Sequence, residues 1–214
     1  MAVYYRTRGY VLKKVDLREA NQLFTVFTED YGKICVLGRG IRKIKSKLRS
    51  GIDIFYLSEI EFVQGKAYKT LTDAKTINKN KDNFEERLKI GELVDKLVKA
   101  PEKDKNIWKL LEEAPKYHYF FWNLLSILGY QVDLYNCSSC HGKLSPIKLS
   151  FEPEGIKCSN CSDKSSKNIS PEVVKIIRLL LKKDWDILSK LRIKKSHLNE
   201  LEDMEACFLE EITV

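Results

Sequence analysis

The chain has 214 residues, of which 43% are hydrophobic and 32% charged, and a formal net charge of +8. This composition excludes a disordered or fibrous chain, and the length allows one large domain or two to three small ones. The most apolar stretch, residues 117–129, is shorter than the roughly 20 residues that cross a bilayer, and the N-terminus has no signal-peptide pattern, so we expect a cytoplasmic protein with no membrane partner.

The positive charge is concentrated in the first third of the chain. Residues 1–75 carry 15 Lys and Arg against 8 Asp and Glu, whereas the remaining residues carry 23 against 22. A basic module of this kind indicates a phosphate-backbone partner. An anionic membrane surface is the alternative, but no amphipathic helix with a lysine-rich face is evident in this region.

The first 77 residues predict a small β-barrel. Turn signals occur at residues 29–32, which end in glycine, and at residues 64–66. Runs with strand character cover residues 10–12, 23–28, 33–38, 52–57 with 58–63, and 67–72. Five strands of this size favour the oligonucleotide-binding (OB) fold, although an SH3-like barrel fits the same periodicity. The aromatic residues of these strands are expected mainly in the core rather than as stacking platforms for bases.

The third strand is followed by a segment, residues 39–49, that we call the basic segment. It holds six positive charges and no acid within eleven residues: Arg39, Arg42, Lys43, Lys45, Lys47 and Arg49. A cationic loop between barrel strands is suited to follow a nucleic-acid backbone, gaining affinity from counterion release. The alternative is a solvated surface loop, and no residue can be assigned a base contact.

Residues 82–214 predict a helical domain after a polar linker at 78–82. Apolar residues recur at helical spacing, and Gly129 and the Ser170-Pro171-Glu172 sequence mark a helix end and a helix start. The predicted helices cover residues 84–98, 107–114, 115–128, 171–181 and about 196–210. The fold class is therefore α+β, with a barrel domain at residues 1–77 followed by helices.

Four cysteines lie between the predicted helices, within residues 135–165. Cys137 and Cys140 form one C-x-x-C pair, and Cys158 and Cys161 form a second pair, with 17 residues between the two pairs. Two such pairs supply the tetrahedral sulfur ligands of a zinc ribbon, and four protein ligands leave no position for a substrate. We therefore expect one structural Zn²⁺. Cys35 and Cys207 lie apart from these four and are expected to be buried.

Other interpretations of the four cysteines are weaker. A zinc deaminase needs an H-x-E element and a proline before its C-x-x-C pair, and neither is present. A thioredoxin-like dithiol leaves the second pair unexplained, and two disulfides need an oxidising compartment. His141 could replace one ligand, and four reduced thiols without a metal remain an alternative.

The whole chain resembles one family in the order and spacing of its motifs. The matching residues are 9–12, 21–28, 31–33, 38–42 and 46–48 in the barrel region, then 121–130 (FWNLLSILGY), the first C-x-x-C pair, 150–151, 154–158, the second C-x-x-C pair and 169–170. These motifs are similar to those of the RecO family of bacterial DNA repair and recombination mediators.

The resemblance implies an N-terminal OB fold, a helical domain with a zinc module, and a protein that is not an enzyme. It also implies binding of single- and double-stranded DNA, annealing of complementary strands and, with RecR, loading of RecA onto DNA covered by single-strand-binding protein (SSB). The four cysteines take the zinc-ligand role and the basic segment takes the DNA-binding role. Residues that bind the SSB tail are not identified; Leu179, Lys182 and Lys183 are guesses.

The resemblance further implies a location in the bacterial cytoplasm, at the nucleoid. A ribosome-associated RNA-binding protein is the alternative function, because an OB-like barrel with a zinc ribbon suits RNA equally well. A zinc hydrolase is disfavoured by the closed ligand set.

Overall fold

The computed structural model divides the chain into two compact units, Met1–Phe120 and Phe121–Val214. We call them the N-terminal and the C-terminal unit. The structure describes residues 3–79, 83–99, 101–113, 116–145, 149–163, 166–183, 188 and 190–213. Residues 80–82 of the expected linker lie outside this set. The N-terminal unit continues beyond the barrel because two helices that follow it pack on the barrel strands.

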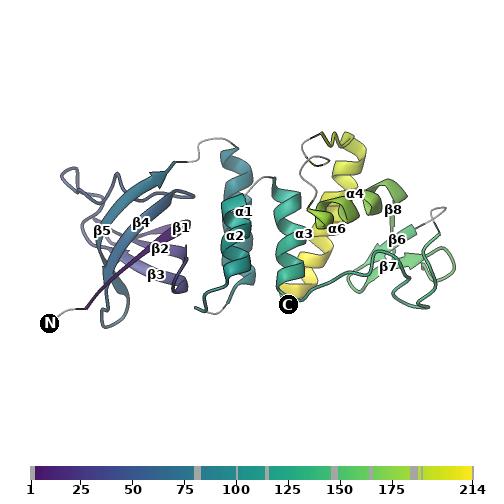
Figure 1. Cartoon of the computed structure of the whole chain (residues 1–214), viewed down its shortest axis with the longest axis horizontal. Coiled ribbons are helices and arrows are strands. Elements are labelled where there is room, and N and C mark those ends of the chain that lie inside the picture. The colour runs from purple at the N-terminus through teal and green to yellow at the C-terminus, as the bar shows by residue number, and fades with distance from the viewer. Residues whose placement is uncertain are drawn as a thin grey trace. The chain divides into compact units, whose positions relative to one another are not determined.

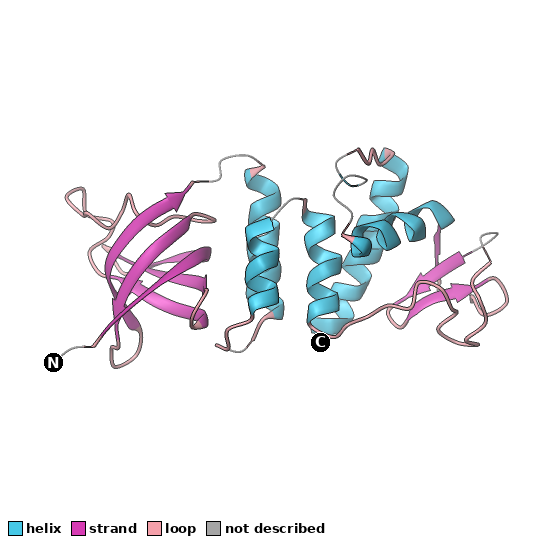
Figure 2. Ribbon diagram, in the orientation of Figure 1, coloured by secondary structure: helices cyan, strands magenta, loops and turns pink. Residues whose placement is uncertain are grey.

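Five strands of the N-terminal unit close into a barrel in the order β1-β2-β3-β5-β4 (Figures 1 and 2). The strands are β1 (Tyr4–Leu17), β2 (Asn21–Thr28), β3 (Gly32–Gly38), β4 (Leu57–Val63) and β5 (Lys69–Asn78). All neighbouring strands are antiparallel except β3 and β5, which pair in parallel. This closed five-stranded barrel confirms the predicted OB-like fold.

The longest strand, β1, is what allows the barrel to close. Its first half pairs with β4, from Tyr4 to Tyr10, and its second half pairs with β2, from Gly9 to Leu17. The register shifts between Val11 and Lys13, where a β-bulge bends the strand from one neighbour to the other. A single strand can thereby lie between the two ends of the sheet.

The strand predicted at residues 52–57 is absent, and β4 begins only at Leu57. Phe55 has a positive φ of 58°, and the backbone N–H of Tyr56 donates to the carbonyl of Asp53, which makes this stretch a turn. Ile52 and Phe55 are nevertheless buried, at 3% and 1% exposure. The apolar pattern of residues 52–57 therefore reflects burial and not strand pairing.

The barrel core confirms that most aromatic residues of the strands are structural. Phe24 and Phe62 are each 1% exposed, and they pack with aliphatic residues from every strand. Phe27 is also fully buried but does not belong to this core cluster. Cys35 was predicted to be buried, and this is wrong: it is exposed on β3, because it alternates with the buried Ile34 and Val36 and so faces outward.

Two helices complete the N-terminal unit, α1 (Phe84–Leu97) and α2 (Lys105–Glu113). Gly91 of α1 lies so close to the barrel that a Cβ atom there would be 3.0 Å from the Leu12 carbonyl oxygen. On α2, the Trp108 ring lies 5.4 Å from the ring of Tyr10, and the Arg8 guanidinium stacks on the same indole. These contacts hold both helices on β1.

The C-terminal unit combines helices with a small three-stranded sheet of order β7-β6-β8. Its elements are β6 (Leu149–Glu152), β7 (Gly155–Cys158), β8 (Lys167–Ile169), α4 (Pro171–Lys182) and α6 (Lys195–Thr213), together with most of α3 (Tyr117–Ile127). The rings of Trp122 on α3 and Phe208 on α6 lie 5.9 Å apart in its core.

The helix ends follow the predicted signals with one difference. Gly129 adopts a φ of +88° just after α3, and the N–H of Tyr130 returns to the Leu125 carbonyl, as expected of a glycine that ends a helix. Ser170 precedes α4 as predicted, but its side chain makes no capping hydrogen bond. Its backbone N–H instead donates to Glu200 of α6, at 2.7 Å, which ties the two helices together.

Candidate metal centre and nucleic-acid interface

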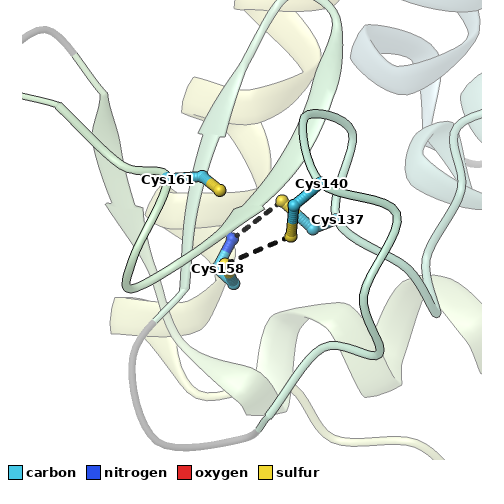
Figure 3. A group of neighbouring side chains, drawn as sticks. All are labelled: Cys137, Cys140, Cys158 and Cys161. Carbon is cyan, nitrogen blue, oxygen red and sulfur yellow. Dashed lines mark hydrogen bonds between the residues drawn. The ribbon is translucent and has the colours of Figure 1, made fainter.

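The four predicted cysteine ligands converge on one point in the C-terminal unit. Their sulfur atoms all lie within 4.8 Å of one another, with Cys161 approaching from the side opposite Cys137 and Cys140 (Figure 3). The Cys140 and Cys158 sulfurs are 3.9 Å apart. Four sulfurs bound tetrahedrally to zinc at about 2.3 Å are about 3.8 Å from one another, so the spacing fits this ion.

Each C-x-x-C pair forms a tight turn that directs its sulfurs to this point. In the first turn, His141 N–H donates to the Cys137 carbonyl and Cys137 N–H donates to the Gly142 carbonyl, at 3.0 and 2.8 Å. His141 adopts a φ of +58° to allow the reversal. In the second turn, the N–H groups of Cys161 and Ser162 both donate to the Cys158 carbonyl.

The electrostatics of the cluster favour a bound cation. Burial raises the pKa of the Cys137 thiol, but backbone N–H groups of Cys140, Cys158 and Ser139 donate to its sulfur and lower the pKa to about 6. The neighbouring sulfurs of Cys140 and Cys158 raise the pKa of Cys161 to about 12. The cluster therefore stabilises the thiolate of Cys137 by itself, whereas a thiolate at Cys161 needs a cation at the centre.

The surrounding residues hold the first turn in place. The N–H of Ser138 donates to the Ile156 carbonyl of β7, at 2.9 Å. The Arg178 guanidinium of α4 donates to the Leu134 carbonyl and lies 4.2 Å from the centre of the Tyr135 ring. These contacts attach the first turn to both β7 and α4, so the metal ligands are supported by the helices of this unit.

The carboxylate of Asp133 accepts hydrogen bonds from the residues just before the first turn, so the stability of the protein should depend on its ionisation. It accepts from the Asn136 side chain and from the N–H groups of Tyr135 and Asn136, and these bonds lower the pKa of its carboxyl group. A lowered pKa in the folded state adds stability above the unfolded-state value of about 3.9, and this stability is lost as the pH falls through the folded-state value.

We therefore expect Asp133→Asn to lower the melting temperature of the protein at pH 7. The cost is under about 1 kcal/mol because the carboxylate is exposed to solvent. Below both pKa values the wild-type carboxylate is protonated, so the two proteins should melt at the same temperature. A difference that persists in acid would show that Asp133 acts through packing and not through its charge.

The donor set is suited to a structural metal ion. All four positions are thiols, which suit Zn²⁺, and within the described part of the chain they form the one cluster of metal-binding side chains. His141 is not among the four. The predicted ligands Cys137, Cys140, Cys158 and Cys161 are thus brought together as expected, in an arrangement compatible with a zinc ion.

The basic segment lies between β3 and β4 and is built from consecutive turns. Lys43 N–H donates to the Gly40 carbonyl and Ser46 N–H to the Lys43 carbonyl, each at 3.0 Å. The segment is anchored by Ile41, which is 1% exposed in the barrel core. Its backbone is also held to the β1–β2 connection, since Arg42 N–H donates to the Ala20 carbonyl at 3.0 Å.

Because Ile41 faces the core, the cations face solvent. All six predicted DNA-binding side chains are exposed: Arg39, Arg42, Lys43, Lys45, Lys47 and Arg49. Of these six side chains, only Arg42 forms an ion pair within the described part of the chain, and its partner is Asp16 at 3.3 Å. The segment thus presents a dense positive surface whose charges are largely uncompensated.

The structure also shows surface features that the sequence does not reveal. Tyr4 and Tyr68, at the ends of barrel strands, are 61% and 42% exposed, unlike the core aromatics. A pocket of about 280 Å³ opens in the C-terminal unit beside Trp122, Tyr130 and Lys183. Of the three residues guessed for the SSB tail, Lys183 lines this pocket, whereas Leu179 and Lys182 do not. The pocket combines α3, α4 and the loop after α3, which explains why it has no sequence signature.

None of the helices in the described residues is both long and apolar enough to cross a membrane.

Comparison with known proteins matches the N-terminal and the C-terminal parts of the chain to the same kind of protein. The family described as "Recombination protein O N terminal" matches residues 1–80, and "Recombination protein O C terminal" matches residues 88–212. A DNA repair protein RecO from Dehalococcoides mccartyi is 30% identical over 92% of this chain and 86% of its own length. Proteins of the same name from Syntrophomonas wolfei and Caldicellulosiruptor saccharolyticus are 30% and 27% identical, over 94% and 96% of this chain and 88% and 92% of their own lengths.

Proposed function

Because the chain belongs to the RecO family of DNA repair proteins, we propose that it is a recombination mediator that binds single- and double-stranded DNA and anneals complementary strands. With RecR, it helps to load RecA onto single-stranded DNA covered by SSB. The observation that carries this proposal is the basic segment, six exposed cations on one loop of an OB-like barrel. In this role the protein works in the bacterial cytoplasm, at the nucleoid.

The proposed mechanism is charge neutralisation without covalent chemistry. Two DNA strands repel each other through their phosphates, and cations that contact both backbones reduce this repulsion and allow bases to pair. Exposed Lys and Arg side chains on short turns can do this without reading sequence, because phosphate contacts are the same at every base. The metal centre is a scaffold here, since its four sulfurs complete the coordination shell.

The pocket beside Trp122 supports the proposed contact with the SSB tail. Its lining is largely apolar, with Ile127, Val132 and Leu181 among its residues, and Lys183 is its one cation. An apolar pocket bordered by a cation suits the end of a peptide, which carries a terminal carboxylate. We propose that the SSB tail docks here.

Replacing Lys183 with glutamate should weaken binding of an SSB tail peptide about tenfold, because the peptide carboxylate then meets a negative charge. Lys182→Glu is the matched control, since Lys182 is its exposed neighbour and does not line the pocket. Fluorescence anisotropy with a labelled peptide measures both. Equal losses in the two variants would indicate a general charge effect and would exclude this pocket.

The experiment that tests the proposed function is annealing of complementary strands coated with SSB, with and without RecR. We expect annealing that does not need a nucleotide cofactor and that slows as salt is added, because salt weakens phosphate contacts. Structured RNA added as a competitor distinguishes the ribosome-associated alternative. Preference for that RNA over single-stranded DNA, together with no annealing, would contradict the mediator role.

A further inference from the structure

The basic segment also borders a pocket, which adds a cation from outside the segment. This pocket of about 350 Å³ opens between β1, β2 and the connection from β3 to β4. Its walls include Ile41 and Ile52, which also belong to the barrel core, so the pocket is continuous with a rigid part of the fold. Three cations line it, Lys14, Arg42 and Arg49.

These cations come from three places in the chain that only the fold brings together. Lys14 lies on β1, where it stands opposite Phe24 of β2, while Arg42 and Arg49 both come from the basic segment. Lys14 and Asp16 are two residues apart on one strand and therefore face the same side of the sheet. The sequence of the basic segment alone gives no indication that Lys14 belongs to the same surface.

Two of the three cations are held by carboxylates. Lys14 donates to Asp53, and Arg42 pairs with Asp16 at 3.3 Å. Asp16 is itself held by Gln22, whose side-chain amide donates to it at 2.8 Å. Among the described residues, Arg49 has no carboxylate partner. Because both ion pairs are largely exposed, each is worth less than about 1 kcal/mol, and an incoming anion can compete with the carboxylates.

We propose that this pocket is a binding site for one backbone phosphate of single-stranded DNA, which Lys14, Arg42 and Arg49 contact. Asp16 and Asp53 orient the cations in the free protein. Their negative charges also repel the phosphate and so lower the affinity of the pocket for DNA. None of the described residues that line the pocket is aromatic, so it offers no ring on which a base could stack, whereas its cations suit a phosphodiester group. This inference rests on the proposed function, because it assigns a further contact to the same DNA.

The carboxylates give the sharpest test, since removing a negative charge should tighten binding. Asp53→Asn keeps the hydrogen bond that the Asp53 side chain accepts from Ile54 N–H at 2.8 Å and loses only the charge. We expect it to tighten binding of an oligo(dT) of about 16 nucleotides by about threefold. Asp73→Asn is the matched control, since Asp73 accepts the same bond from Ala74 N–H at 2.9 Å on β5 and does not line the pocket.

The complementary variant removes a cation. Lys14→Gln should weaken binding of the same oligonucleotide about fivefold and reduce the slope of log affinity against log salt by about 0.7, the value for one lost phosphate contact on a single strand. Lys66→Gln, in the exposed turn between β4 and β5, makes the same charge change away from the pocket. Anisotropy titrations at several salt concentrations, with melting temperatures of every variant, provide the measurement.

Different results separate the possible failures. If the wild-type protein does not bind the oligonucleotide, both the proposed function and the proposed phosphate site are wrong. If the wild type binds, but Lys14→Gln and Asp53→Asn have the same affinity as the controls Lys66→Gln and Asp73→Asn, only the proposed phosphate site is wrong. A rise in melting temperature with inorganic phosphate that Lys14→Gln abolishes, without any change in DNA affinity, would assign the pocket to a free anion and would also overturn the proposal.

Discussion

We expect the four clustered cysteines to bind one Zn²⁺, so replacing Cys158 with serine should abolish zinc binding and unfold the small sheet of β6, β7 and β8. The three strands contain only four, four and three residues, and five of their side chains are buried, among them Phe151 and Ile156. A sheet of this size has too little core to be stable alone, and a structural zinc site contributes about 10–16 kcal/mol of apparent binding free energy. We expect the C-terminal unit to lose about 3–5 kcal/mol of stability.

Zinc content, determined by elemental analysis, and thermal unfolding measure this effect. Cys35→Ser is the matched control, because it makes the same chemical change at an exposed cysteine of the barrel and should keep both the metal and the melting temperature. Binding of DNA through the basic segment should change by less than about twofold in Cys158→Ser, since the barrel has its own core. Full zinc content and an unchanged melting temperature would refute the four-sulfur site.

Alanine at Arg42, Lys43, Lys45 and Lys47 together should weaken DNA binding about a hundredfold at moderate salt. All four side chains are exposed, and Ile41, which anchors the segment, is unchanged, so the barrel should stay folded. If each side chain contacts one phosphate, the slope of log affinity against log salt for a single strand should fall by about 3. The loss should be the same for every DNA sequence, because backbone contacts carry no base information.

The matched control removes the same charge from elsewhere in the N-terminal unit. Lys66, Lys75, Lys105 and Lys109 are all exposed, and their replacement with alanine lowers the net charge by the same amount. Equal losses in the two quadruple variants would mean that DNA responds to the net charge of the unit and not to the basic segment. A changed preference for particular sequences would contradict the backbone mechanism.

The metal site could be predicted residue by residue because its information is local. A C-x-x-C pair forms its tight turn from neighbouring residues, so the spacing of Cys137 and Cys140 already implied two converging sulfurs. In the structure all four sulfurs, two from each pair, lie within 4.8 Å of one another. Helix starts and ends at Ser170 and Gly129 were predictable for the same reason, since they depend on the backbone preferences of one or two residues.

Strand boundaries were less predictable because they depend on pairing. Residues 52–57 have an alternating apolar pattern, yet a turn at Phe55 buries these side chains without forming a strand. Conversely, β1 extends over 14 residues, although its polar second half has little strand character of its own. What makes it a strand is its ladder with β2, whose partner residues lie later in the chain.

The sequence by itself determined the family, the clustering of the four cysteines and the cationic character of the loop after the third strand, because each of these is carried by residues close together in the chain. Only the tertiary structure decided that Lys14 joins Arg42 and Arg49 around one pocket, and that Trp122 and Lys183 border another. The physical reason is that a pocket is defined by which elements pack side by side. Closure of the barrel and packing of α3 and α4 bring together residues that no local pattern connects.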